Sequence, residues 1–473
     1  MDRARPAGLG SPRHDPSRHR GLRTRRVPAH EALPGDGDED LRSGLRSRGR
    51  ERAGAGLSES SPAVAGVVRP RAKLSTFAAL RAPNYCLYWI GLVFYVLGHR
   101  AEYVTFAWIV WELTHDPLYL GYLGLAQGVP LVVFQVFGGV LADRVHRLRL
   151  LIGTQLLTAA TLAVAFGLMV LDITRIEYFL VLAALSNTFR AFDEPSRLSL
   201  VPQLIDRARL SNAIALGSIP WQAGRMLGPS ITGILIAAFG GALGLGLAAA
   251  ASFLALALYS RIRLEGETPP HDGQPVLTQL ADGLRFVGAD FVFASLIALA
   301  MFNSLFGMSY VTLLPIFADS YFKAGSVGYG LLNAAHGAGS LIGTLTLATI
   351  AHRIARPGRA LLIGAACVGL GLMAFSRAPG MGLAMPMLLL VGFSGTFYLT
   401  QVSTVIQQKV PDQLRGRVLG LYSLCWNLLP LGGLLGGALA SAVDARFAVL
   451  FGGAMVTANA LILLKSRRLR RIT

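Results

Sequence analysis

The sequence predicts an all-α membrane protein with twelve transmembrane helices in two six-helix halves. Three observations predict it: an apolar composition, twelve separate apolar runs, and basic residues that gather in every second connection. Of the 473 residues, 53% are hydrophobic and 15% are charged, and the mean hydropathy is +0.51. Soluble domains carry about 25% charged residues, so the excess apolar surface must face lipid.

Twelve apolar runs are long enough to cross a bilayer as helices. The hydrocarbon core needs about 20 apolar helical residues, and only helices or closed barrels satisfy their backbone polar groups there. The predicted spans are residues 87–111, 119–142, 149–171, 177–199, 213–238, 242–260, 293–315, 328–350, 360–376, 382–406, 418–441 and 447–464.

The distribution of basic residues predicts the orientation, because short cytoplasmic loops accumulate Lys and Arg. Of the 44 Lys and Arg residues, 37 lie near one face, four lie near the other, and Arg100, Arg190 and Arg225 lie inside spans. Trp89 and Trp111 flank the first span, where aromatic belts occur. We therefore expect a multi-pass protein of the cell inner membrane with both termini in the cytoplasm.

The longest internal connection follows the sixth span and divides the chain six plus six. The repeated pattern of Val201-Pro202 before Arg209 and Val410-Pro411 before Arg415 indicates a duplication. Duplicated halves of this kind hold a substrate between them near the bilayer midplane. The predicted segments are a disordered basic cytoplasmic region at 1–80, an N-terminal six-helix half at 81–260, a cytoplasmic linker at 261–292, a C-terminal six-helix half at 293–464 and a basic cytoplasmic tail at 465–473.

The first 73 residues hold 16 basic and 9 acidic residues without apolar periodicity, a composition typical of disorder. No continuous apolar segment marks a cleaved signal peptide. A solvated tail is the favoured interpretation, and attraction of its arginines to the membrane surface is an alternative. Because the next methionine after Met1 is Met169, a wrongly assigned start is a third interpretation, which N-terminal sequencing would test.

Several classes of protein are disfavoured. The net charge of +18 lies in a tail and short loops, whereas nucleic-acid binding needs a basic face on a folded domain. The three cysteines all fall in apolar runs, which argues against a disulfide framework. The sequence contains no HExxH, GxxxxGK or GxSxG motif and no Cys/His metal spacing. We therefore expect no catalytic residue, metal or cofactor, and a transporter driven by an ion gradient rather than a membrane enzyme, channel or receptor.

Residues 138–149, between the second and third spans, read GGVLADRVHRLR. This motif resembles the signature loop of the major facilitator superfamily. Gly139 would allow close helix approach, and Asp143, with Arg144 and Arg147, would form a gating latch. His146 stands where the family usually has glycine, so a tighter or differently shaped turn is expected.

Five further segments carry a closer resemblance: 111–114 (WELT), 192–197 (FDEPSR), 227–229 (LGP), 314–318 (LPIFA) and 410–418 (VPDQLRGRV). They resemble those of the enterobactin exporter and macrolide efflux group, and the resemblance covers nearly all of residues 80–465. It implies a proton-coupled exporter of a small amphipathic organic compound, siderophore-like or drug-like, working by alternating access. The alternatives are an integral-membrane enzyme and a facilitator or importer of the same fold with a different substrate.

Glycines recur at four-residue spacing, which lets helix backbones touch. In the fifth span, Gly224 and Gly228 precede Pro229 and resemble the antiporter signature of the superfamily, although the upstream part is incomplete. The other pairs are interpreted as packing. They are Gly124 with Gly128, Gly339 with Gly343, Gly432 with Gly436, and Gly433 with Gly437.

Ionisable side chains inside spans are functional candidates, because burying a charge in lipid is costly. Glu102 is the candidate for proton coupling, and His99 is a second. A permanent ion pair is the alternative for Glu102. Arg100 is a poor partner for it, because side chains two residues apart lie on different helix faces.

The remaining intramembrane charges are Arg100, Arg190, Asp193 and Arg225. We expect Asp193 and Arg225 to neutralise each other between the fourth and fifth spans.

A substrate cavity would be lined by polar and aromatic side chains, which suit an amphipathic ligand. Small-molecule substrate, protons and membrane lipids are the expected partners of a monomer, with no nucleic acid. Many of the candidates could instead bond between helices. They are Asn187, Trp221, Gln222, Asn303, Tyr310, Asn333, His336, Tyr398 and Gln401.

Overall fold

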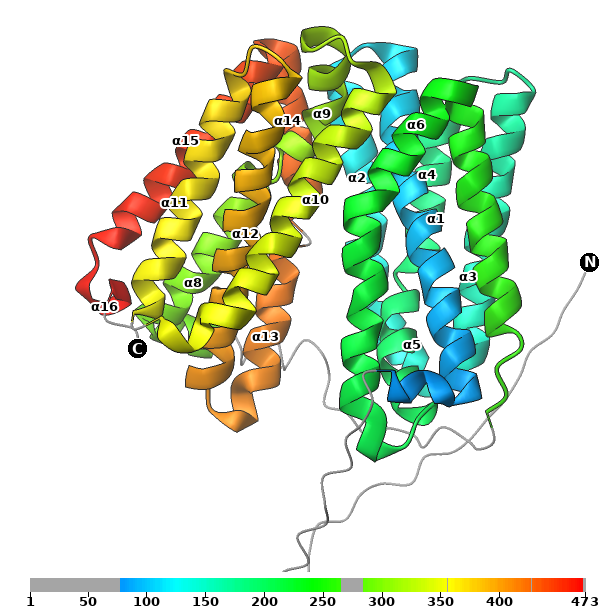
Figure 1. Cartoon of the computed structure of the whole chain (residues 1–473), viewed down its shortest axis with the longest axis horizontal. Helices are drawn as coiled ribbons and strands as arrows, with labels where there is room; N and C mark the ends of the chain where they lie inside the picture. Colours follow the sequence, from blue (N-terminus) through cyan, green and yellow to red (C-terminus); the bar gives the residue numbers. More distant parts are fainter. Residues whose placement is uncertain (1–76, 265–283, 355, 427, 471–473) are drawn as a thin grey trace, which may run out of the picture. The chain divides into compact units, whose positions relative to one another are not determined.

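The computed structural model describes residues 77–264, 284–354, 356–426 and 428–470, and within these the side chains of 136–144, 198, 412, 413, 415 and 416 lie outside the description. The described part is helical throughout, without strands (Figure 1). Its α-helices are α1 (Pro83–Thr114), α2 (Pro117–Arg144), α3 (Arg147–Val170), α4 (Ile176–Arg190), α5 (Asp193–Leu200), α6 (Leu210–Tyr259), α8 (Phe291–Phe302), α9 (Tyr310–Ile316), α10 (Gly325–Ile350), α11 (Pro357–Ser376), α12 (Met381–Lys409), α13 (Asp412–Trp426), α14 (Leu429–Ala442), α15 (Ala445–Leu464) and α16 (Arg467–Arg470).

Every predicted span overlaps a helix, and the differences lie at interruptions. The fourth span is divided between α4 and α5. The seventh, predicted at 293–315, contains a π-helical turn, η4 (Asn303–Gly307), and a second one, η5 (Phe317–Tyr321), follows α9 just beyond the predicted end. The fifth and sixth spans run together as α6, whose Gly240 has φ 82° and ψ 171°. Only glycine adopts such a conformation readily, so the chain turns there without a separate loop.

Nine helical stretches in the described part are long and apolar enough to cross a membrane. The predicted first and fourth spans are absent from these nine: α1 has 32 residues, whereas α4 ends after 15. His99, Arg100 and Glu102 lie in the middle of α1 and lower its mean hydropathy. The chain is therefore a multi-pass membrane protein, while the count of twelve spans and their division into halves stay predictions.

The helices before the 261–292 connection pack on one another, and so do those after it. In the first set α1 lies along α6, α3 also packs on α6, and α2 packs on α4 (Figure 1). In the second set α10 packs on α12, and α11 packs on α12 and α15. Close packing of such apolar helices, rather than a hydrophobic effect between them, holds bundles together in lipid.

In the described part, most of the contact between the first set and the second is made by two helix pairs, α6 with α10 and α2 with α14. Small residues allow this approach. A Cβ on Gly330 of α10 would collide with the Pro229 carbonyl of α6, and one on Gly233 of α6 would collide with the Ser326 carbonyl of α10. A Cβ on Gly437 of α14 would likewise meet the start of α2. We call the contact of α6 with α10 and the contact of α2 with α14, taken together, the seam.

The seam lies where the chain turns from α1 into α2 and from η5 into α10. At this end the Trp111 indole Nε1 donates a hydrogen bond to Asp319 Oδ2 over 3.0 Å. Trp111 lies in the last turn of α1, and Asp319 belongs to η5. The glycine pairs predicted as packing features lie in these contacts or in contacts between neighbouring helices: Gly339 and Gly343 face the backbone of α12.

Two predicted segments fall largely outside the described residues. Residues 1–76 and 265–283 belong to the predicted disordered region and linker, and the assignments there stay predictions. Residues 78–81 form a short 3-10 helix, in which the Ala79 N–H donates to Asn212 Oδ1 over 2.9 Å. The side chain of Asn84 bonds to the backbone of Arg263, so the first residues of the predicted linker are attached to the start of α1.

Candidate functional site

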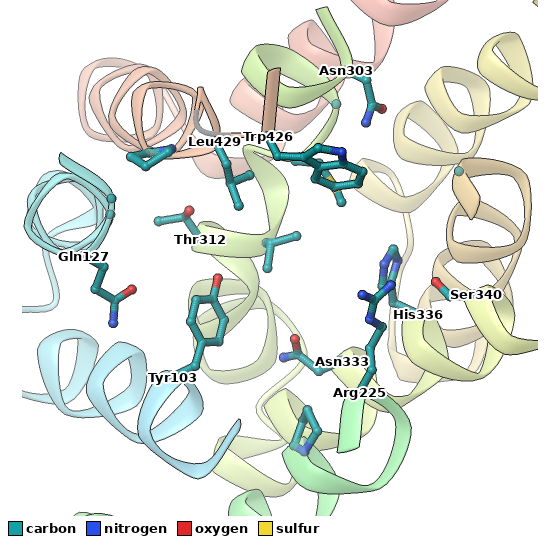
Figure 2. A pocket seen from close by; sticks show the side chains of 18 of the residues that line it. Tyr103, Gln127, Arg225, Asn303, Thr312, Asn333, His336, Ser340, Trp426 and Leu429 are labelled. Atoms are coloured by element: carbon teal, nitrogen blue, oxygen red, sulfur yellow. The ribbon is translucent and has the colours of Figure 1, made fainter. Parts of the chain in front are cut away.

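A cavity of about 380 Å³ lies between the two sets of helices (Figure 2). α1, α2 and α6 contribute one part of its wall, and η4, α10, α12 and α14 contribute another. A volume of this size suits a small organic ligand. Its polar or aromatic lining residues are His99, Arg100, Tyr103, Gln127, Asn187, Arg225, Asn303, Thr312, Asn333, His336, Ser340, Thr396 and Trp426.

Four of the nine predicted cavity residues line this cavity: Asn187, Asn303, Asn333 and His336. The other five lie elsewhere: Trp221, Gln222, Tyr310, Tyr398 and Gln401.

Three of those five contribute to packing or support the wall. The ring of Trp221 packs edge-on against Tyr95 and His99. Tyr310 is fully buried and its hydroxyl bonds to His336 Nδ1 over 2.7 Å, which orients a lining side chain. Tyr398 is fully buried in the core. The alternative role predicted for these candidates is hydrogen bonding between helices. Tyr310 has this role, because it bonds from α9 to His336 of α10.

Sequence reasoning missed Tyr103, Gln127, Thr312, Ser340, Thr396 and Trp426. Gln127 and Trp426 are isolated polar or aromatic residues inside apolar runs, and this isolation could have marked them as candidates for the cavity wall. Because spans of this composition are apolar on every side, the sequence did not indicate which face of each helix turns toward the cavity.

A buried ion pair joins α1 to α4. The Arg190 guanidinium pairs with Glu102 Oε2, and the Ser186 hydroxyl donates to Glu102 Oε1 over 2.5 Å. Glu102 is 1% exposed and Arg190 is 4% exposed. The Asn187 amide in turn approaches the Ser186 hydroxyl at 3.4 Å. Since Asn187 lines the cavity, a short polar path leads from the cavity to Glu102 although Glu102 itself is not at its wall.

The predicted pair between Asp193 and Arg225 is wrong. Asp193 Oδ2 instead accepts from Arg197 over 3.3 Å, and its Oδ1 accepts from the Thr154 hydroxyl of α3. The reason is the break after Arg190: α5 restarts at Asp193 and brings its carboxylate against α3 and its own next turn. Arg225 lies on α6 and lines the cavity.

Glu102, Arg190, Asp193 and Arg197 together form what we call the buried charge network. Two carboxylates and two guanidinium groups balance one another in it. The Tyr95 ring lies between the cations, with the Arg197 guanidinium 3.5 Å and the Arg190 guanidinium 5.3 Å from its centroid. Such cation–π contacts stabilise desolvated arginines. The network therefore neutralises its own charge.

The cavity has a different charge balance. Arg100 and Arg225 both line it, and no Asp or Glu does so among the described residues. Neither arginine forms a salt bridge within that part of the chain, and their charges repel each other. Figure 2 shows Tyr103, Asn333 and Arg225 facing Leu429 and Trp426 across the cavity. Two cationic groups thus line one part of the cavity, and the large apolar side chains of Leu429 and Trp426, with Thr312 and Asn303 beside them, lie opposite Arg225.

The predicted gating loop is described only in part. The side chains of Gly139, Asp143 and Arg144 lie outside the described residues, so the latch stays a prediction. Arg147 begins α3 and donates from its guanidinium to the Ser199 carbonyl over 3.1 Å. His146 has φ −59° and ψ 112°, a conformation that does not require glycine. The departure from the family motif is therefore accommodated without backbone strain.

A bundle of apolar helices around a polar cavity, with buried charges beside it, defines a membrane transporter. Residues 74–472 match the family described as transmembrane secretion effector, and the chain belongs to this family of the major facilitator superfamily.

Curated relatives agree with this assignment. The staphyloferrin A transporter of Staphylococcus aureus is 25% identical over 72% of this chain and 85% of its own length. The multidrug efflux pump Tap of Mycolicibacterium fortuitum is 27% identical over 73% and 86%, respectively. The enterobactin exporter of Escherichia coli is 29% identical over 76% and 86%. The chain is thus a transporter of a small molecule and not an enzyme.

Solved structures share the fold. A peptide transporter in complex with sulfate aligns with a TM-score of 0.66 at 14% identity, over 82% of this chain and 95% of that one. The nucleoside transporter NupG aligns with a TM-score of 0.64 at 15% identity, over 81% of this chain and 100% of that one. At such identities the likeness concerns the fold and carries no information on substrate.

Proposed function

We propose that this protein is a proton-coupled exporter of a small amphipathic organic compound, siderophore-like or drug-like, in the cell inner membrane. It works as a monomer by alternating access, with twelve helices in two halves around one cavity. The single observation that carries the proposal is a cavity between two sets of helices that meet at the seam.

The seam supports alternating access. Its turns, at residues 115–116 and 322–324, belong to the connections predicted to carry few basic residues and hence to face away from the cytoplasm. In this orientation the conformation is closed on the outer side. Transport requires the seam to open and the opposite end to close, where the loop of Gly139, Asp143, Arg144 and Arg147 would act as the latch. Backbone contacts through glycine suit such a motion, because they hold two discrete packings rather than a continuous range.

Glu102 is the proposed proton carrier. Protonation would remove its charge and release Arg190, and the path through Ser186 and Asn187 connects it to the cavity. A buried carboxylate beside a functional cavity is a recurrent place for such coupling. His99 lines the cavity next to Arg100 and is the second candidate.

The direction and the substrate class are supported by relatives. Two of those reported above are named as an exporter and an efflux pump, and their compounds are a siderophore and drugs. The mixed polar and apolar lining of the cavity favours an amphipathic compound.

Flux in proteoliposomes tests the proposal. A neutral, a cationic and an anionic dye (dansylglycinamide, Hoechst 33342 and dansylglycine) are offered with and without an imposed pH gradient. We expect saturable transport of at least one dye that depends on the gradient. Glu102→Gln should remove that dependence, because the side chain no longer releases a proton.

Glu112→Gln, an exposed carboxylate on the same helix, is the matched control and should keep the dependence. Transport by Glu102→Gln that follows the gradient as in the wild type would show that another residue carries the proton. Flux that ignores the gradient in the wild type would contradict proton coupling itself.

A further inference from the structure

The cavity holds two positive charges that the described part of the chain does not neutralise. Charges within the membrane are costly unless they are paired or hydrated. The buried charge network meets this requirement internally. Arg100 and Arg225 are not paired in this way, because the described cavity wall contains no carboxylate and neither guanidinium has a salt bridge there; Arg225 is exposed and Arg100 is half-buried.

The surroundings of Arg100 also differ from those of the arginines in the buried charge network. Its Nε is buried without a hydrogen-bond partner in the described part of the chain. Its charge and that of Arg225 repel each other. Two guanidinium groups therefore converge on one region of the cavity wall. A bound anion would relieve the repulsion and satisfy the open donors, since guanidinium groups bind carboxylates and phosphates through paired hydrogen bonds.

The opposite side of the cavity is suited to an apolar group. Leu429 and Trp426 face Arg225 across the cavity (Figure 2), and Val311 and Leu399 extend the apolar lining. A ligand with an acidic group at one end and an aromatic or aliphatic body at the other would match both sides. A cationic amphipathic compound would meet two like charges and no counter-charge.

We propose that the cavity selects an amphipathic organic anion, whose acidic group binds Arg100 and Arg225 and whose apolar body packs against Trp426 and Leu429. This inference deepens the proposed function and rests on it. Binding at equilibrium tests it without flux, so the two can fail separately. Retained gradient-driven flux with no preference for the anion would overturn only the anion site.

Equilibrium binding to the purified full-length protein uses three probes that share one fluorophore. Dansylglycine is an anion, dansylglycinamide is its neutral counterpart, and the mono-dansyl derivative of ethylenediamine is a cation. We expect the anion to bind at least about 10-fold more tightly than the neutral probe, a difference of about 1.4 kcal/mol, because its carboxylate accepts charge-assisted hydrogen bonds that the neutral amide does not. The cation should bind more weakly than both.

Variants assign the preference to the two arginines. Arg225→Gln and Arg100→Gln should each reduce anion affinity by about 10-fold and leave the neutral probe unchanged. Arg225→Lys and Arg100→Lys keep the charge and should retain most of the preference. Gln127→Leu, an uncharged change in the same cavity, is the control for general disturbance of the wall, and a monodisperse elution profile verifies folding of each variant.

Equal binding of the anionic and neutral probes to the wild type, or no saturable binding of the anion, would overturn the proposal. So would an anion preference that survives in both Gln variants, because the preference would then arise elsewhere. If both Gln variants fail to fold, the Lys variants decide: loss of the preference with the charge retained contradicts a site based on charge.

Discussion

Glu102→Ala is expected to destabilise the folded protein by about 3–5 kcal/mol, the cost of leaving one partner of a buried ion pair without its counter-charge. In this variant Arg190 stays buried between α1 and α4 with no carboxylate in contact. Thermal unfolding in detergent, followed by tryptophan fluorescence, measures the loss as a lower melting temperature and a reduced yield of monodisperse protein.

The double variant Glu102→Ala with Arg190→Ala distinguishes the contribution of the ion pair to stability from the contribution of side-chain packing. We expect it to be more stable than the sum of the single effects allows, by at least about 1 kcal/mol, because contacting residues are strongly coupled. Glu112→Ala, an exposed change on the same helix, should alter stability by no more than about 0.5 kcal/mol. Strictly additive losses would mean that the pair contributes little and that each side chain acts through packing alone.

Gly330→Val is expected to abolish most transport while the protein still folds. The added side chain would collide with the Pro229 carbonyl across the seam, and a backbone atom cannot rotate aside. Overpacking costs about 1–3 kcal/mol, which would reduce the population of the seam-closed state by about 5- to 150-fold. The flux of a gradient-driven dye into proteoliposomes measures the effect.

Gly217→Val on α6 is the matched control, because a Cβ at that position meets nothing within 4 Å. It should transport at nearly the wild-type rate. Normal transport by Gly330→Val would mean that the seam does not need to close during the cycle, and aggregation of that variant alone would assign the contact to folding. Adding Ser230→Gly to this variant tests the origin of the collision: it should not restore flux, because the atoms that the new side chain meets belong to the backbone of Pro229 and Ser230.

The positions of the helices could be predicted from the sequence because lipid imposes a simple rule on length and hydrophobicity. The predicted range 447–464 corresponds to α15, Ala445–Leu464, and 360–376 corresponds to α11, Pro357–Ser376. The break in the fourth span was also encoded, since Asp193, Glu194 and Pro195 form a typical helix start. Recognition of that signal would have indicated Arg197, four residues later, as the partner of Asp193.

The cavity was harder to predict. In an apolar span, hydrophobic residues surround the whole helix, so periodicity does not indicate which side faces a neighbour. Tyr398 and Tyr310 are fully buried although their composition equally suits a cavity wall. Arg100 and Arg225 were recognised as costly charges, but their convergence depends on how α1 and α6 are rotated. That rotation is determined by glycine contacts such as Gly228 against the Arg100 side chain.

The central claim is that the cavity opens to one side of the membrane at a time. Pulsed electron paramagnetic resonance on reconstituted protein measures this directly, with Cys86, Cys367 and Cys425 replaced and spin labels placed in two pairs. One pair, at Leu113 and Lys323, measures the distance at the seam end of the bundle. The other pair, at Ile214 and Thr349, measures the distance between α6 and α10 at the end away from the seam. Under conditions that support flux, we predict two populations in which one distance lengthens as the other shortens. Simultaneous lengthening of both distances, or no change in either while flux proceeds, would contradict the account.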